Sequence, residues 1–534
     1  MRTALTILVL AALASTLPAC SGGEKSSNTL RVAADTEPAA LDPHLVTGFT
    51  EHRLLTSMFE GLTTLNQKTL AVEPGAAESW TVSDDGLVYT FKINPKAKWS
   101  DGTPLTAKDF VYGWRRHLSL NLASEYSYML WCIKNAEAYN KGQLTDFDEV
   151  GAKALDDATL EVTLAYPAPY FLSMQIHYSW FPVLQSNIEA FGKIDDRNSK
   201  WTRAGNMVSN GPFKLVEWNP NQIIRVERNE HYWDAANVKL DAIEFYPMQN
   251  LLTEERSFQS GKVHFIETLL ATKIETYRKE KPEVLRIEPF IGTYFYRFNT
   301  TRPPLDDPRV RRALAMAIDR QSICDSVMYG AASPAVALTP PELAGYTAKA
   351  RIDFNVEEAR RFLAEAGYPN GQGLRPIEIL FNDSEDHERI AEAIQDMWKL
   401  NLNVEVTTNK QEWKVYLNTM NALGYDVVRS AWIADYLDPM NYMECFVTGG
   451  GNNRTGWSSK PYDDLVEQAR YCVDPVQRYE LLQQAEAILL EEAPIAPIYT
   501  YKQKLLVSPE VQGYDINPIG YLNYRSFSLA SATP

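Results

Sequence analysis

Residues 99–110 read WSDGTPLTAKDF, and a helix start can be recognised within this stretch. Thr106 is followed three residues later by Asp109. This spacing resembles a capping box, in which the two side chains satisfy backbone N–H groups at the first turn of a helix. We therefore expect a helix that begins after Thr106 and runs through Trp114.

Strand patterns lie on both sides of that helix. Residues 88–93 (VYTFKI) and 160–164 (LEVTL) alternate apolar and polar side chains, as half-buried strands do. Residues 30–33 predict a first strand, and the apolar run 495–501 predicts another near the end of the chain. Strand and helix patterns alternate along the whole chain without an internal repeat, which predicts an α/β fold.

Three more helices are marked at their ends. Asp307 precedes Pro308, which suits the first turn of a helix because its missing N–H would have no partner there. Asn355 with Glu358 marks another helix start, and Gly367 marks the end of the same helix. A last long helix is expected around residues 481–490.

The composition is that of a large globular protein. The chain has 534 residues, too many for one hydrophobic core, so two or three domains are expected. Hydrophobic residues make up 45% and aromatic residues 11% of the chain, which excludes a disordered or fibrous protein. The formal net charge of −16 argues against nucleic acid as a partner, because proteins that bind it present a basic face.

The first twenty residues indicate export. Arg2 is followed by an uncharged apolar segment, residues 4–14, which leads to Leu17-Pro18-Ala19-Cys20. So short an apolar run is typical of a signal peptide and not of a membrane span. We expect residues 1–19 to be removed as a signal peptide, Cys20 to become the lipid-modified N-terminus, and residues 20–29 to form a flexible tether. The alternative is an ordinary signal peptide cut nearby.

Catalytic and metal-binding motifs are missing from the sequence. The GxSxG, HExxH, GxxxxGK[ST] and GxGxxG patterns do not occur, and the seven histidines show no metal-ligand spacing. We therefore expect no enzyme, no cofactor and no metal. Cys445 and Cys472 are the nearest pair of cysteines; they either close a disulfide loop or are small apolar core residues.

Aromatic residues gather in two places. One is residues 126–131, and the other contains the six aromatic residues from Trp413 to Tyr442. Taken singly, most of these are expected in the core. Arg429 and Asp435 lie in the second segment, however, and an apolar wall with a few placed charges is how ligand sites are built. We expect a ligand cleft here.

Several motifs, which occur in order along the chain, carry a resemblance to a known family. They are DTEP at 35–38 with LDPH at 41–44, FEGL at 59–62, AESW at 77–80, WSDGTPLTAKDF at 99–110, NGPF at 210–213, PPL at 303–305 with Asp307, and AWIADY at 431–436. In these the chain resembles the extracytoplasmic oligopeptide-binding proteins of ABC importers, solute-binding protein family 5. The resemblance implies a two-lobed periplasmic-binding-protein type II fold with an additional α/β domain. Projected onto this chain, lobe I combines residues 30–60, 186–290 and 503–534, the additional domain is 61–185, and lobe II is 291–502.

The resemblance also implies the ligand-binding residues. An extended peptide would lie between the lobes and pair its backbone with strand-like segments of the protein. Asp435 matches the position that holds the peptide α-amine, and Arg429 and His387 match positions that meet peptide carboxylates. The remaining positions that line the cleft are matched by Trp432, Trp413, Tyr126, Tyr501, Phe49 and Arg297.

The chain departs from the family pattern at charged positions. Arg297 stands where relatives carry an acidic residue, which allows a more acidic ligand. Met328 and Met420 stand at two basic positions. By resemblance, Arg429 would meet the carboxylates of shorter peptides and His387 those of longer ones, so tripeptides and pentapeptides should bind better than tetrapeptides.

These observations predict a monomeric lipoprotein of the cell envelope, located in the periplasm or at the outer face of the cytoplasmic membrane. It would capture short peptides and deliver them to the permease of an ABC importer, with its lipid as the one contact to the membrane. Within binding proteins, the alternative is a narrower ligand such as a cell-wall peptide or a dipeptide. Outside that class, the alternatives are a peptidase or amidase, and an adhesin or chaperone-like surface lipoprotein.

Overall fold

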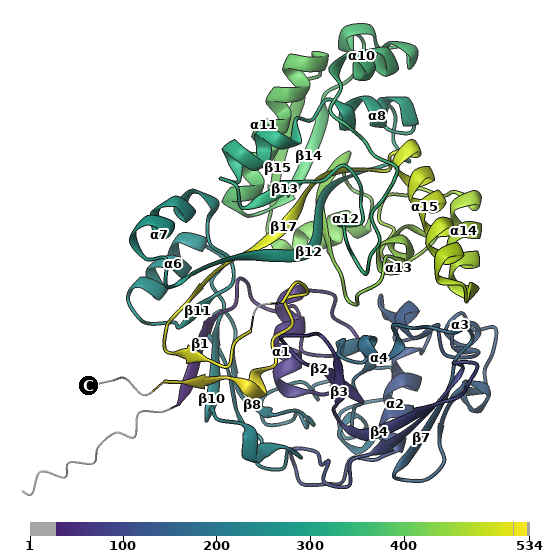
Figure 1. Ribbon diagram of the computed structural model, residues 1–534, viewed down its shortest axis with the longest axis vertical. Coiled ribbons are helices and arrows are strands. Elements are labelled where there is room, and N and C mark those ends of the chain that lie inside the picture. The colour runs from purple at the N-terminus through teal and green to yellow at the C-terminus, as the bar shows by residue number, and fades with distance from the viewer. Residues whose placement is uncertain (1–27, 516, 531–534) are drawn as a thin grey trace, which may run out of the picture.

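The computed structural model describes residues 28–515 and 517–530. The expected signal peptide, the lipidation site Cys20 and most of the tether lie outside these residues. Figure 1 shows an elongated molecule with an upper and a lower part, and both ends of the described chain belong to the lower part. Two long strands, β12 (Leu285–Phe298) and β17 (Ile495–Val507), pass from one part to the other.

One mixed sheet runs through both parts. Among the described residues it has eleven strands in the order β15-β14-β16-β12-β17-β11-β1-β10-β9-β8, with β13 paired to β17 outside this path. The remaining bounds are β1 (Thr29–Ala33), β8 (Phe213–Asn219), β9 (Ile223–Arg228), β10 (Ala242–Tyr246), β11 (Phe265–Ile266), β13 (Ala332–Pro334), β14 (Ile377–Asn382), β15 (Val406–Gln411) and β16 (Val427–Ile433). Strand β1 pairs in parallel with β10, and β14 pairs in parallel with β15 and β16. The predicted α/β character is confirmed.

A separate four-stranded sheet lies in the lower part, with the order β4-β5-β7-β6. Its strands are β4 (Ala77–Val82), β5 (Val88–Ile93), β6 (Ala152–Ala154) and β7 (Thr159–Thr163), so both strands predicted from alternation are present. Helix α2 (Ala107–His117) packs beside it and begins at the predicted capping box: the backbone N–H of Thr106 donates to Asp109 Oδ2 at 2.7 Å. Two small sheets pair β2 (Thr63–Leu65) with β3 (Val72–Pro74) and β18 (Val511–Gln512) with β19 (Ser528–Leu529).

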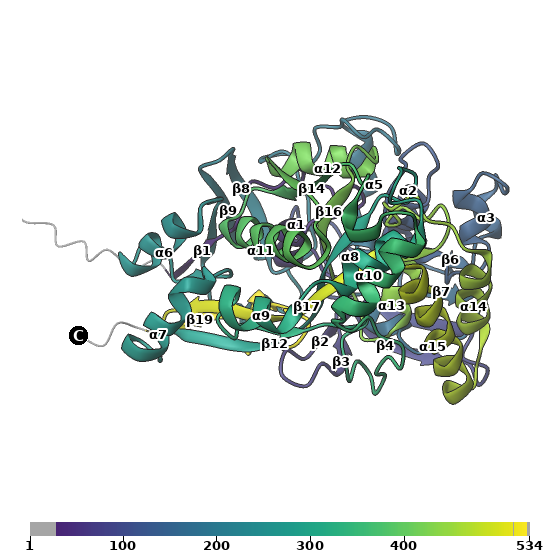
Figure 2. The same cartoon turned by 90° about the horizontal axis from the view of Figure 1, so that it is seen from above.

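The other helices cover the sheets, and Figures 1 and 2 show α14 and α15 side by side at one end of the upper part. Their bounds are α1 (Phe49–Met58), α3 (Ala136–Asn140), α4 (Phe171–Met174), α5 (Gln185–Glu189), α6 (Leu251–Gln259), α7 (Ile274–Glu280), α8 (Pro308–Met316), α9 (Arg320–Ser322), α10 (Val356–Glu365), α11 (Glu385–Leu402), α12 (Trp413–Asn421), α13 (Met440–Met443), α14 (Lys460–Tyr471) and α15 (Pro475–Glu492). The side chains of Asp307 and Asn355 accept hydrogen bonds from the first turns of α8 and α10, at 2.8 and 3.1 Å. Gly367 follows α10 with a φ of +96°, a conformation that favours glycine. These predicted helix ends are confirmed.

The pairing of β12 with β17 is interrupted at one place. Pro289 pairs with Lys502, and the next regular pair is Thr293 with Thr500. Strand β12 therefore accommodates two more residues than β17 at the point where both strands pass between the two parts. Such an irregularity weakens the ladder locally, so it is where we expect the two parts to bend relative to each other.

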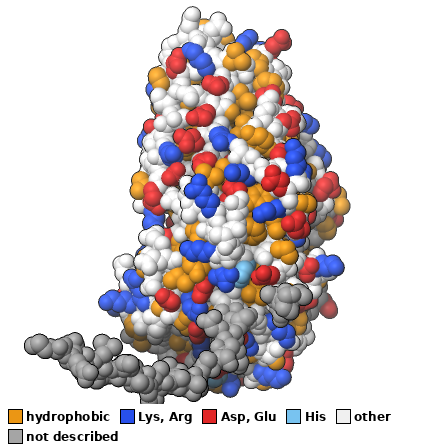
Figure 3. All heavy atoms as spheres, turned by 90° about the vertical axis from the view of Figure 1, so that its left-hand side faces the viewer, with side chains coloured by type: hydrophobic (Ala, Val, Ile, Leu, Met, Phe, Trp, Pro, Cys, Tyr) orange, Lys and Arg blue, Asp and Glu red, His pale blue; other side chains and the backbone are white. Residues whose placement is uncertain are grey.

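The structure settles the state of the cysteines, which the sequence left open. Cys445 and Cys472, like Cys132 and Cys324, are free in the described chain, so the disulfide alternative is wrong. Within the described residues no helix has the length and apolar character needed to cross a membrane. Figure 3 shows Lys and Arg side chains interspersed with Asp and Glu on one face of the molecule.

Candidate functional site

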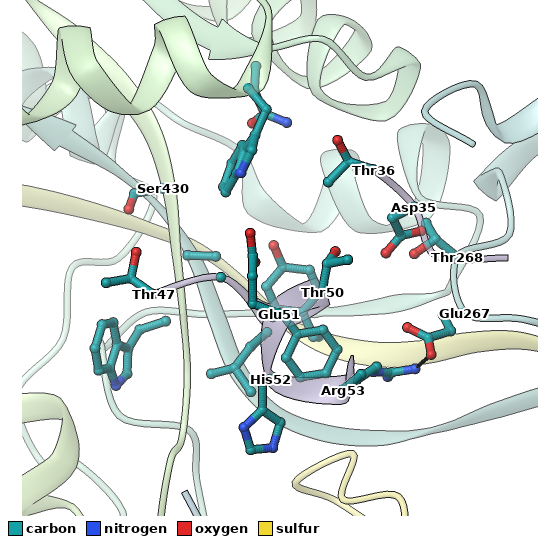
Figure 4. A pocket seen from close by; sticks show the side chains of 18 of the residues that line it. Asp35, Thr36, Thr47, Thr50, Glu51, His52, Arg53, Glu267, Thr268 and Ser430 are labelled. Atoms are coloured by element: carbon teal, nitrogen blue, oxygen red, sulfur yellow. Dashed lines mark ion pairs between the residues drawn. The ribbon is translucent and has the colours of Figure 1, made fainter. Parts of the chain in front are cut away.

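A cavity of about 450 Å³ lies between the upper and lower parts. It is lined by all nine residues that the resemblance implies as ligand-binding: Phe49, Tyr126, Arg297, His387, Trp413, Arg429, Trp432, Asp435 and Tyr501. Figure 4 shows Asp35 and Thr268 at one side of this cavity and Thr47 and Ser430 at the other. Segments far apart in the sequence thus meet around one space, while the role of each residue in binding stays a prediction.

Asp435 presents a buried carboxylate to the cavity. Its side chain is only 12% exposed, and His177 Nε2 lies 3.4 Å from its Oδ1. Burial raises the pKa of Asp435 to about 7; the hydrogen bond from Asn441 opposes this shift and the charge of Glu444 adds to it. Burial also lowers the pKa of His177 well below 6.5, with His52 and His117 contributing, so His177 is neutral. Asp435 therefore has no cationic partner among the described residues, which suits a carboxylate that meets a ligand cation.

Asn441, which the sequence reasoning missed, orients this carboxylate. It lies in α13, where its Nδ2 donates to Asp435 Oδ2 at 3.3 Å. Its Oδ1 accepts hydrogen bonds from Trp432 Nε1 at 2.9 Å and from the backbone N–H of Asp435 at 3.1 Å. The Asn441 amide therefore holds both the Trp432 indole and the Asp435 carboxylate in place. No capping or alternation pattern marks Asn441, although it lies only six residues from Asp435 and nine from Trp432.

Arg429 lies on β16 and carries a second unpaired charge. Its Nη2 donates to the hydroxyl of Tyr501 at 3.0 Å, and its Nη1 donates to Asn382 Oδ1 at 3.3 Å. The guanidinium carbon is 5.0 Å from the ring centroid of Tyr294, a distance at which a cation is attracted to an aromatic face. No described carboxylate forms an ion pair with Arg429.

His387 lines the cavity, and its assignment to the carboxylates of longer peptides stays a prediction. Its Nδ1 lies 3.5 Å from the hydroxyl of Tyr294. Burial lowers its pKa well below 6.5, and the charges of Arg429 and Lys504 lower it further, so the ring is neutral at pH 7. Lys504, another lining residue that the sequence reasoning missed, is already paired: its Nζ is 2.8 Å from Asp386 Oδ2.

The aromatic residues divide between the cavity wall and the core. Of the six between Trp413 and Tyr442, those that line the cavity are Trp413, Tyr416 and Trp432. Tyr425, Tyr436 and Tyr442 do not line it, and all six except Trp413 are buried. From the lower part, Phe49 contacts Phe290 with ring centroids 5.8 Å apart. The cleft predicted from aromatic density is present, although half of that cluster does not line it.

The two methionines at basic positions differ in their environment. Met420 lines the cavity, whereas Met328 is 2% exposed, packs in the core of the upper part and is not a lining residue. The expected preference for tripeptides and pentapeptides over tetrapeptides stays a prediction.

Sequence comparison relates this chain to proteins of one family. The family model described as "Bacterial extracellular solute-binding proteins, family 5 Middle" matches residues 71–454. The chain is 36% identical over 516 residues to the "Oligopeptide-binding protein OppA" of Bacillus subtilis, and the match covers 94% of this chain and 93% of the relative.

Solved structures agree with the sequence comparison. The Escherichia coli murein tripeptide binding protein MppA is similar with a TM-score of 0.90 at 34% identity, covering 94% of this chain and 99% of that one. An unliganded open form of MppA gives a TM-score of only 0.67 at the same identity, covering 94% and 98%. The arrangement of the two parts therefore differs from that open form.

These matches span nearly the whole described chain. They confirm the two-lobed α/β fold with an additional domain that the motifs implied. They also confirm the resemblance itself, since a relative that is 36% identical over 94% of the chain establishes membership of the same family. The chain belongs to family 5 of the bacterial extracellular solute-binding proteins.

Proposed function

We propose that this protein captures short peptides outside the cytoplasm and delivers them to the permease of an ABC importer. The observation that carries the proposal is the open backbone edge of β16. Strand β14 pairs with β16 only at Val427 and Val428, and the following residues, 430–434, line the cavity. An extended peptide can add its own backbone to such an edge, which gives affinity for peptides as a class.

The charges in the cavity suit the two ends of a peptide. Asp435 offers a carboxylate without a cation, and Arg429 offers a guanidinium without an acid. They are six positions apart along β16 and the residues after it, which is at most about 22 Å of extended chain. A free α-amine and a free carboxylate would supply the missing partners. The names of the relatives, an oligopeptide-binding and a murein tripeptide binding protein, support peptides as the ligand.

The domain division follows the boundaries implied by the resemblance. We propose lobe I as residues 30–60 with 186–290 and 503–534, an additional domain at 61–185, and lobe II at 291–502. The four-stranded sheet falls within 61–185, and the irregular pairing of β12 with β17 falls near residues 290 and 502. Both features support these limits.

The anchoring of the protein is proposed from its sequence. Cleavage before Cys20 and acylation of that residue would leave a monomer tied to the cell envelope by lipid alone, in the periplasm or on the outer face of the cytoplasmic membrane. Metabolic labelling with a radioactive fatty acid tests this: the full-length protein should be labelled, and the Cys20→Ser variant should not. Equal labelling of both would exclude Cys20 as the site.

Mass spectrometry of ligands that stay bound through purification tests the function. A mixture of short peptides of varied sequence is the expected result. One defined cell-wall peptide or one dipeptide would establish the narrower alternative. Ligands that are not peptides, together with no binding of trialanine in calorimetry, would refute the proposal.

A further inference from the structure

A second contact between the upper and lower parts lies outside the ligand cavity. Tyr170, the residue before α4 in the lower part, stacks on Tyr436 of the upper part with ring centroids 4.6 Å apart. Tyr166 of the lower part meets the ring of Tyr471, the last residue of α14, edge to face at 5.0 Å. All four residues lie apart from the lining of the cavity. These four rings form the tyrosine contact.

Two arginines of the upper part add to the tyrosine contact. The guanidinium carbon of Arg478, on α15, is 5.6 Å from the ring centroid of Tyr170, and that of Arg470, on α14, is 5.9 Å from the ring centroid of Tyr166. A cation at such a distance is attracted to an aromatic face. Arg478 also donates two hydrogen bonds to the carboxylate of Asp438, at 2.9 and 2.6 Å. This ion pair within the upper part fixes the guanidinium in the position where it meets Tyr170.

The tyrosine contact exists only while the two parts are together. Figure 1 shows α13 and α14 of the upper part facing α3 and α4 of the lower part across the boundary. Tyr170 is 7% exposed and Tyr436 is 1% exposed, and each stacks on the ring of the other. Separation of the parts would return these rings to water and break their stacking, both of which are unfavourable. The tyrosine contact therefore stabilises the closed arrangement whether or not a ligand fills the cavity.

We propose that the tyrosine contact is a latch that sets the affinity for peptides from outside the cavity, through the balance between open and closed forms. The inference rests on the proposed function, because its readout is the binding of a peptide. If the open form predominates without ligand, the apparent affinity is the affinity of the closed form reduced by the fraction of molecules that are closed. Any factor lost from closure then appears as the same factor in the dissociation constant. Because a peptide enters the open form, the loss falls on the dissociation rate and leaves the association rate unchanged.

Replacing Tyr170 tests the latch. Calorimetry should show that Tyr170→Ala binds trialanine at least about fivefold more weakly than the wild type, whereas Tyr170→Phe, which keeps the ring, should bind within about twofold of it. Stopped-flow tryptophan fluorescence, which is suitable because Trp413 and Trp432 line the cavity, should assign the loss in Tyr170→Ala to faster dissociation.

The matched control is Tyr112→Ala. Tyr112 lies on α2 of the lower part, does not line the cavity, and has Glu189 and Arg116 of the same part as charged neighbours. Its replacement removes a tyrosine ring without touching the upper part, so the wild-type dissociation constant should be kept. An equal loss in this control overturns the proposal, because the effect would then not depend on the tyrosine contact.

The other outcomes are equally defined. An unchanged dissociation constant in folded Tyr170→Ala overturns the proposal, as does an equal loss in Tyr170→Phe or a loss confined to the association rate. If circular dichroism shows that Tyr170→Ala is unfolded, Tyr471→Ala decides: Tyr471 is 49% exposed, its replacement should weaken trialanine at least about threefold, and an unchanged affinity overturns the proposal. Equal binding of trialanine by all variants refutes this inference alone, whereas no binding by the wild type refutes the proposed function.

Discussion

The carboxylate of Asp435 allows the peptide-binding proposal to be tested by pH. Burial raises its pKa to about 7, so near pH 7 about half of the ligand-free molecules carry a proton there. A peptide ammonium binds the ionised form, and its own charge stabilises that form. Affinity should therefore be greatest between pH 7 and about 8, where the peptide amine is still largely protonated, and decrease as the pH falls through 7. By pH 5 the loss should reach about 100-fold, or roughly 2.7 kcal/mol at about 1.36 kcal/mol per pH unit.

Replacing Asp435 by Asn removes the charge and keeps the shape. Breaking a buried ion pair costs about 3–5 kcal/mol, so trialanine should bind roughly 150- to 5,000-fold more weakly to this variant. The residual binding should be independent of pH between 5 and 8.

The stability of the ligand-free protein depends on pH in the opposite direction from its affinity for the peptide. A folded-state pKa raised from 3.8 to about 7 means that this group's contribution to stability is largest at acidic pH and is lost as the pH rises to 7. Asp435→Asn should therefore have the higher melting temperature at pH 8.

Isothermal titration calorimetry with trialanine from pH 5 to 8 measures these effects. Runs at pH 7 in two buffers with different ionisation enthalpies should show release of about half a proton per peptide bound by the wild type, and no release by Asp435→Asn. N-acetyl-trialanine, which has no ammonium, should bind the wild type poorly. A flat pH profile for the wild type, or equal affinity of Asp435→Asn for trialanine, would refute the assignment of Asp435 to the amine.

Three further predictions concern other parts of the molecule. Small-angle scattering should show a smaller radius of gyration when trialanine is added to ligand-free protein, because the break in β12–β17 pairing allows the parts to close; an unchanged radius at saturation would count against bending there. Arg429→Met should weaken trialanine at least tenfold but C-amidated trialanine much less, since the amide has no carboxylate to lose, and equal losses in calorimetry would contradict this role. Asn355→Ala should lower the free energy of unfolding in urea by about 1 kcal/mol through loss of the cap of α10, and a stability equal to wild type would show that the cap contributes nothing.

Local features of this fold could be predicted from the sequence because their physics is local. A cap needs only residues within one turn, so Thr106 with Asp109 and Asn355 with Glu358 identified their helices. Alternation over six residues likewise located β5. The eleven-stranded sheet could not be obtained this way, since the pairing of β12 with β17 joins residues that lie about 200 positions apart.

The residues that line the site could be predicted from the sequence, but their charges and hydrogen-bond partners could not. Motif resemblance named residues that do line one cavity. Burial lowers the pKa of His387, and the charges of Arg429 and Lys504, which the tertiary fold brings near it, lower it further. The pairing of Lys504 with Asp386 was missed because it joins residues 118 positions apart, whereas Asn441 lies only six positions from Asp435 but belongs to no motif that marks it.

The late position of strand β17 in the chain affects when the sheet can form during synthesis. It pairs with β12 and β13 in the upper part and with β11 in the lower part, and it is among the last elements of the chain to be synthesised. Until residues 495–507 have emerged, neither part can complete its sheet. Truncation before β17 should therefore leave the eleven-stranded sheet incomplete in both parts.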